Sequence, residues 1–109
     1  MKQVCDKLVR DKIPKIIESN GETPIYRTLS PEEYWQYLLK KVSEELQEVK
    51  TANSLEERKK ELADKLELIR AMAEFNGLCL EDIIEEADKK NVKNGGFKRR
   101  LLLEKVIRK

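Results

Sequence analysis

Apolar residues recur every three or four positions in three long stretches of the chain, the spacing of one helix face. The pattern predicts helices over residues 31–51, about 54–76 and about 80–91. In the first stretch the apolar face consists of Trp35, Leu38, Leu39, Val42, Leu46 and Val49. In the third it consists of Leu80, Ile83, Ile84 and Ala87. The chain is therefore predicted to be all-α and built on a helical hairpin.

The ends of these stretches carry capping signals. The run Ser30-Pro31-Glu32-Glu33 combines a capping serine, a proline at the first helical position and a glutamate three residues after the cap. Asn53 or Ser54 is expected to cap the second helix, and the Asn-Gly pair at 76–77 to end it. Pro14 predicts a short additional helix. The segment TPIYRTL reads as an extended linker or a short strand.

The second stretch is apolar on two sides. One stripe consists of Leu55, Leu62, Leu66, Ile69 and Ala73, and the other of Leu68, Met72 and Phe75. A helix that is apolar on two sides is packed on two sides. We therefore expect a homodimer or a higher homo-oligomer.

Composition narrows the class of protein. Glu, Lys and Leu dominate the 109 residues, whereas Gly (4) and Pro (3) are scarce, which favours helices over sheets. The length fits one compact domain over residues 1–109. The net charge of +2 favours neither nucleic acid nor an acidic partner. With no signal-like or membrane-spanning apolar run, we expect a cytoplasmic protein whose Cys5 and Cys79 are reduced, although one disulfide stays possible.

The chain contains no histidine. This excludes Ser–His and Cys–His nucleophile pairs, His-bearing zinc sites and an imidazole general base. Two cysteines cannot form a four-cysteine zinc site. If the protein is an enzyme, its chemistry has to use carboxylates and a hard cation, and oxygen ligands suit Mg²⁺ or Mn²⁺.

Two acid-x-x-acid pairs are candidates for such a site. Glu45 and Glu48 lie on one flank of the first long helix, about 70° and about 130° from the centre of its apolar stripe. Glu61 and Asp64 stand at the head of the second stripe on the next helix, whereas Glu44 points away from the core. Twelve residues separate Glu48 from Glu61, so the two pairs could face each other across a hairpin. Because 21 residues are acidic, an ordinary solvated surface remains the alternative.

Three segments together resemble a known family. EELQE (44–48) and ELAD (61–64) look like the E-E-x-x-E and E-x-x-D signature of the MazG-like, all-α nucleoside triphosphate pyrophosphohydrolases. KLVRDKIPKII (7–17) and GGFKRRLLLEK (95–105) resemble the ends of a small phosphoribosyl-ATP pyrophosphohydrolase-like branch. The resemblance implies Mg²⁺-dependent hydrolysis of a nucleoside triphosphate to a monophosphate and pyrophosphate. It also implies that helical hairpins from two subunits pack into a bundle, so that a second subunit completes a core of the four-helix-bundle type.

Carried onto this sequence, the family's metal ligands fall on Glu45, Glu48, Glu61 and Asp64. Of these, Glu45 or Glu48 could orient or deprotonate the water that attacks the α-phosphate. Lys and Arg are the residues that would grip the triphosphate. The candidates are Arg10, Lys12, Lys93, Lys98 and Arg99.

Two other functions stay open. The basic tail after residue 97 suggests a helical module that binds nucleic acid, but it lacks aromatics beyond Phe97, and its LLL and VI runs are typical of packing positions. These features argue against nucleic acid as a partner. The second alternative is a non-catalytic helical protein that binds other proteins through the same bundle.

Overall fold

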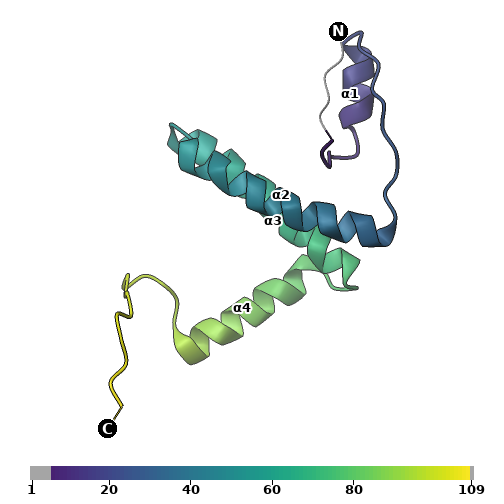
Figure 1. Ribbon diagram of the computed structural model, residues 1–109. Helices are drawn as coiled ribbons and strands as arrows, with labels where there is room; N and C mark the ends of the chain where they lie inside the picture. The colour runs from purple at the N-terminus through teal and green to yellow at the C-terminus, as the bar shows by residue number, and fades with distance from the viewer. Residues whose placement is uncertain (1–5, 109) are drawn as a thin grey trace.

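The computed structural model describes residues 6–108, which form four helices and no strand (Figure 1). Their bounds are α1 Ile13–Ser19, α2 Pro31–Thr51, α3 Leu55–Phe75 and α4 Leu80–Asn94. The all-α prediction is confirmed. The TPIYRTL segment is an extended linker, and α4 continues three residues beyond the predicted end at position 91.

The helix boundaries follow from the predicted caps. The Ser30 hydroxyl accepts a hydrogen bond from the Glu33 N–H (3.3 Å), and the Glu33 carboxylate accepts one from the Ser30 N–H (3.3 Å), which completes a capping box. Ser54, not Asn53, caps α3, because its hydroxyl accepts from the backbone N–H of Glu57 (3.1 Å). Local sequence thus sets where both long helices begin.

The first cap also predicts a pH dependence. Hydrogen bonds from the Arg27 guanidinium, and then from the backbone of Ser30, lower the pKa of Glu33 from 4.5 to about 2. Because the native protein binds this proton less tightly than the unfolded chain, Glu33 stabilises the fold above pH 4.5. We expect its contribution to be lost as the pH falls from about 4.5 towards 2. Thermal unfolding followed by circular dichroism should show a shallower acid dependence in Glu33→Gln.

The exposed neighbour Glu32 provides the control for this measurement, because it lies in the same first turn of α2. Glu32→Gln should keep the acid dependence of the unaltered protein. Equal slopes for Glu33→Gln and Glu32→Gln would contradict the role given to the Arg27–Glu33 pair.

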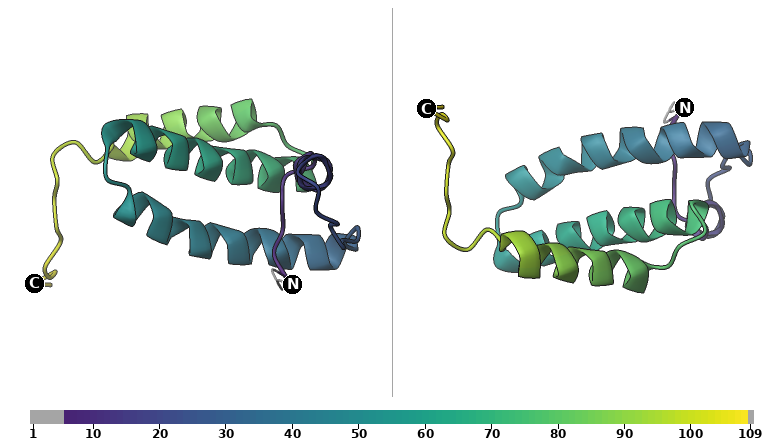
Figure 2. Two further views of the ribbon diagram at one scale, coloured as in Figure 1. Left: turned by 90° about the horizontal axis from the view of Figure 1, so that it is seen from above. Right: turned by 90° about the horizontal axis from the view of Figure 1, so that it is seen from below.

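The two long helices α2 and α3 pack as an antiparallel hairpin, and α4 leaves the end of this hairpin at an angle (Figures 1 and 2). The buried core consists of Leu38, Leu68, Ala73 and Leu80. The ring of Trp35 stacks on Phe75, with 5.2 Å between the ring centroids. The radius of gyration is 18.7 Å, against about 13 Å for a compact chain of this size. The fold is therefore more open than the compact domain predicted from length.

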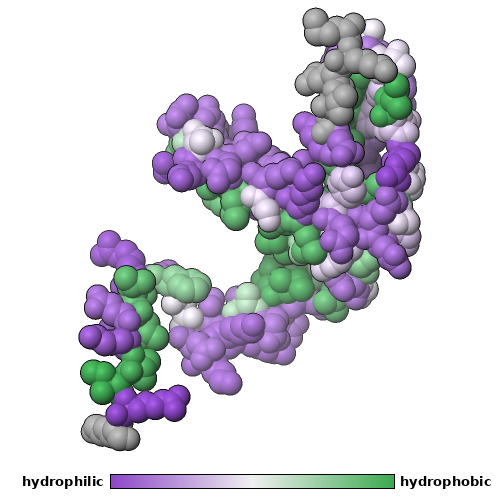
Figure 3. All heavy atoms as spheres, viewed as in Figure 1, coloured by the Kyte–Doolittle hydropathy of each residue, from purple (hydrophilic) through white to green (hydrophobic). Residues whose placement is uncertain are grey.

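Much apolar surface remains uncovered within this chain. Leu68 and Ala73, one from each predicted stripe of α3, are buried. Leu62, Leu66 and Ile69 of the first stripe are 58%, 44% and 42% exposed, and Phe75 of the second stripe is 40% exposed. Figure 3 shows apolar atoms gathered in the angle between the hairpin and α4. The apolar residues of the tail, which were predicted to pack, are exposed as well: Leu101, Leu102, Leu103, Val106 and Ile107. None of the helices described is long and apolar enough to cross a membrane.

Candidate metal centre

Three carboxylates meet where α2 and α3 face each other. Glu45 on α2 and Glu61 and Asp64 on α3 each place an oxygen within 4.8 Å of the others. Their side chains are 14%, 23% and 45% exposed. Helical spacing explains this placement, because Glu61 and Asp64 precede Leu68 by seven and four residues on the face that α3 turns to α2. The structure thus brings together three of the four residues predicted to bind metal.

Glu48, the fourth, lies outside this group of three. It is exposed one helical turn beyond Glu45. The negative charges of Glu45 and then Glu61 raise the pKa of Glu48, so its carboxyl lies within electrostatic reach of both. Glu48 and Glu61 also line a cavity of about 370 Å³ at the turn of the hairpin. The cavity is lined by Glu48, Thr51, Ala52, Glu57, Lys60 and Glu61.

Each of the three clustered carboxylates is paired with a cation. The Lys65 ammonium lies 3.4 Å from Glu45 Oε2 and 3.5 Å from Glu61 Oε2. Lys41 lies 3.4 Å from the other oxygen of Glu45. The Arg10 guanidinium lies 2.7 Å from Asp64 Oδ1. When Glu48 is included, the four candidate carboxylates are therefore accompanied by three cations.

Lys65 was not among the residues singled out from the sequence, although a signal was present. It follows Glu61 by four residues and precedes Leu68 by three, so it stands on the inward stripe of α3. A lysine at an inward position has to be paired when it is largely buried, and Lys65 is only 13% exposed. The presence of a lysine within the inward-facing row of α3 is therefore the sequence signal that could have identified Lys65.

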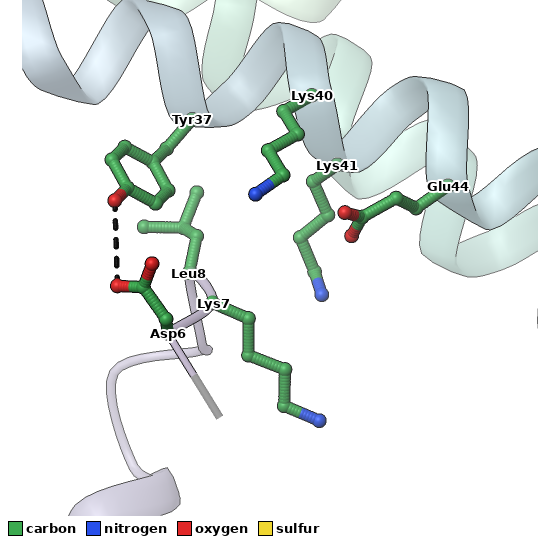
Figure 4. A pocket seen from close by; sticks show the side chains of 7 residues that line it. All are labelled: Asp6, Lys7, Leu8, Tyr37, Lys40, Lys41 and Glu44. Atoms are coloured by element: carbon green, nitrogen blue, oxygen red, sulfur yellow. Dashed lines mark hydrogen bonds between the residues drawn. The ribbon is translucent and has the colours of Figure 1, made fainter. Parts of the chain in front are cut away.

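The N-terminal segment runs beside the cluster and contacts both helices of the hairpin. The Tyr37 hydroxyl on α2 donates to Asp6 Oδ1 at 3.5 Å (Figure 4), and Arg10 donates to Asp64 on α3. Glu44, which was predicted to be solvated, is exposed on the same side of α2, close to Lys41 in Figure 4. The segment thus carries one predicted phosphate-binding residue, Arg10, to the site.

The remaining predicted phosphate-binding residues lie elsewhere. Lys12 stands at the start of α1, Lys93 is in the last turn of α4, and Lys98 and Arg99 lie in a turn that follows α4. All four are exposed, and none is paired with the clustered carboxylates in the part of the chain that the structure describes. The tail projects away from the hairpin (Figures 1 and 2).

The cysteines are the last of the sequence-based expectations that concern side-chain chemistry. Cys79 is a free, exposed thiol at the N-cap of α4. Cys5 lies outside the described residues, so the expectation of two reduced thiols stays a prediction.

The donor set of the cluster fits a hard divalent cation. Carboxylate oxygens are the ligands preferred by Mg²⁺, which is commonly held by one or two protein carboxylates together with waters and substrate phosphates. Mn²⁺ takes the same ligands. The three converging carboxylate oxygens agree with such an ion. Partly buried carboxylates this close together also repel one another unless positive charge lies nearby.

Comparison with known proteins places the sequence in a family. The sequence model described as phosphoribosyl-ATP pyrophosphohydrolase matches residues 14–91, which span all four candidate carboxylates. An uncharacterized protein of Mycolicibacterium smegmatis is 48% identical over 48 residues, which cover 44% of this chain and 49% of that protein. The matched segment is thus about half the length of the relative. No solved structure matches the chain.

Proposed function

The chain belongs to the phosphoribosyl-ATP pyrophosphohydrolase family of the MazG-like superfamily, and from this premise we propose that it is a Mg²⁺-dependent nucleoside triphosphate pyrophosphohydrolase. Water attacks the α-phosphorus of the nucleotide, the α–β anhydride bond breaks, and a nucleoside monophosphate and pyrophosphate leave. The observation that carries the proposal is the convergence of Glu45, Glu61 and Asp64 between α2 and α3. Mn²⁺ is expected to replace Mg²⁺, since both take oxygen ligands.

The residues divide into two roles. Glu45, Glu61 and Asp64 hold the ion, which neutralises phosphate charge and polarises the phosphoryl oxygens when bound. Glu48 lies outside that group and lines the adjoining cavity, so it is positioned to orient the attacking water and to accept its proton. We assign the base to Glu48 instead of Glu45, because Glu45 is already paired with Lys41 and Lys65.

The charge around the cavity explains why a metal is needed. Glu48, Glu57 and Glu61 line it, and Lys60 is the one cation among the lining residues. A triphosphate carries several negative charges, and these carboxylates repel it unless cations intervene. Arg10 is the best-placed side chain to contact the phosphates, because it already reaches Asp64. Binding of phosphate by Lys12, Lys93, Lys98 and Arg99 stays a prediction.

The uncovered stripe of α3 supports the predicted homodimer. Leu62, Leu66 and Ile69 form an apolar row that this chain leaves between 42% and 58% exposed. Two hairpins that pack through this row would make a four-helix bundle and bury apolar area on both subunits. The carboxylate cluster lies on the other face of α3, towards α2, so each subunit would keep its own set of ligands.

A direct assay tests the proposed function. The protein is incubated with Mg²⁺ and a panel of canonical nucleoside triphosphates, modified nucleoside triphosphates and phosphoribosyl-ATP, and pyrophosphate is measured. We expect release from at least one substrate, loss of release in excess EDTA, and recovery when Mg²⁺ or Mn²⁺ is restored. Absence of pyrophosphate with every nucleotide would overturn the proposal, and release that persists in EDTA would remove its metal-dependent part.

A further inference from the structure

Lys65 holds a central place in the carboxylate cluster, and we infer that it is the internal counter-ion that a bound metal has to displace. Its ammonium group lies between Glu45 on α2 and Glu61 on α3, 3.4 Å and 3.5 Å from their oxygens. These are two of the three groups whose oxygens converge. Lys65 thus connects the two helices at the point where the proposed ion would bind.

Burial makes this pairing different from an ordinary surface ion pair. Lys65, Glu45 and Glu61 are partly buried, at 13%, 14% and 23% exposed, so water screens their charges less than it does at the open surface. Lys89 and Glu85 on α4 have the same i,i+4 spacing and the same orientation, but they are 68% and 69% exposed. Exposed pairs of this kind contribute little to stability, whereas removing one partner of a buried pair leaves an uncompensated charge.

Two consequences follow for the chain. Without metal, Lys65 keeps the carboxylates of Glu45 and Glu61 together across the hairpin and limits their repulsion. When a metal ion binds to the same carboxylates, the ion and the Lys65 ammonium repel each other. Lys65 therefore has to move away from at least one carboxylate. The ammonium group then becomes available to a phosphate oxygen beside the site. The contact with phosphate rests on the proposed function, whereas the pairing of Lys65 with the carboxylates and its displacement by a metal do not.

Lys65→Met tests the first consequence in a chelator. Methionine keeps most of the length and apolar volume of the lysine stem and removes only the charge. In EDTA we expect the melting temperature of Lys65→Met to fall by about 5 °C, since about 1 kcal/mol corresponds to about 4–8 °C in a domain of this size. The further change Glu45→Gln should recover most of that loss by removing one of the repelling charges. Lys89→Met, the matched control, should leave the melting temperature unchanged.

Mn²⁺ binding, measured by calorimetry or by electron paramagnetic resonance, tests the second consequence. Loss of the competing ammonium should lower the dissociation constant of Mn²⁺ about tenfold in Lys65→Met, the equivalent of about 1.4 kcal/mol. Lys89→Met should bind Mn²⁺ as the unaltered protein does. A lysine with only a structural role would lower the melting temperature without tightening Mn²⁺ binding, and that result would overturn the inference.

The failure of this inference is distinguishable from failure of the proposed function. Unchanged Mn²⁺ affinity in Lys65→Met, in a protein that still releases pyrophosphate, would overturn the role of Lys65 alone. Tighter Mn²⁺ binding and lower stability in a protein that releases no pyrophosphate would confirm the counter-ion and overturn the enzymatic proposal. If no variant binds Mn²⁺, both are overturned.

Discussion

Replacement of Glu61 by Gln is expected to lower the rate of Mg²⁺-dependent pyrophosphate release by about 10²–10³-fold, the usual effect of losing one group that stabilises transition-state charge. The amide keeps the shape of the side chain but removes the charge of one of the three proposed ligands. Because Glu61 lies at the turn side of the hairpin and is not part of the buried core, the helices should persist. Steady-state kinetics measure the rate, circular dichroism checks that the helices persist, and Mn²⁺ titration of the same preparation checks the weakened metal binding.

Matched controls separate this effect from a general loss of charge. Asp64→Asn should reproduce the result, because Asp64 belongs to the same group. Glu85→Gln should not, since Glu85 and Asp88 have the same acid-x-x-acid spacing on an exposed face of α4. Glu44→Gln should also leave the rate of pyrophosphate release unchanged, because Glu44 is exposed beside Lys41. Loss of turnover in Glu44→Gln as large as in Glu61→Gln would show that the site is placed wrongly on α2.

The helices could be predicted closely because their ends are set by neighbouring residues. Ser30 with Glu33, and Ser54 with Glu57, form caps over three residues, so no distant part of the chain has to be known. The sequence did not decide between Asn53 and Ser54 as the N-cap of α3, because both residue types are common N-caps and the two positions are adjacent. In the structure the Asn53 N–H donates to the Glu57 carboxylate instead (2.8 Å).

The site could be predicted only in part, because helical spacing fixes a direction and not a distance. The wheel placed Glu45 and Glu48 on one flank of α2, but only the packing of α3 decides that Glu45 is the one that joins Glu61 and Asp64. Arg10 is a clearer case. It is 54 residues from Asp64 in the sequence, and no local pattern predicts their contact at 2.7 Å. Such long-range pairs depend on the path of a connecting segment, here the non-helical stretch before α1.

The open shape of the fold has a physical cause that cannot be predicted from composition. A stripe such as Leu62, Leu66 and Ile69 shows that a helix has a second apolar face, but not whether this chain or another covers it. In the structure α4 contacts α3 near its own start and then diverges, so the stripe stays between 42% and 58% exposed. Length alone predicts a compact domain, but it does not say whether one chain covers all of its apolar faces.

Leu66→Asp is expected to convert the proposed dimer into a monomer. Leu66 lies in the middle of the uncovered α3 row and is 44% exposed, so the substitution places a charge in the intersubunit core while leaving the hairpin's own core intact. Truncation or polar replacement of a central interface residue costs about 2–4 kcal/mol, which weakens association by about 30-fold to 700-fold. Sedimentation velocity of the unaltered protein should give twice the mass of one chain, and Leu66→Asp the mass of one.

The control for this change is Ile25→Asp, because Ile25 is 93% exposed in the extended linker before α2. It should remain dimeric. Because each subunit is expected to keep its own carboxylates, monomeric Leu66→Asp should still bind Mn²⁺ when its helix content is preserved. A dimer that survives both Leu66→Asp and Leu62→Asp would exclude the α3 row as the interface. A monomeric unaltered protein would mean that the apolar row is covered by something other than a second copy, and the four-helix bundle would have to be abandoned.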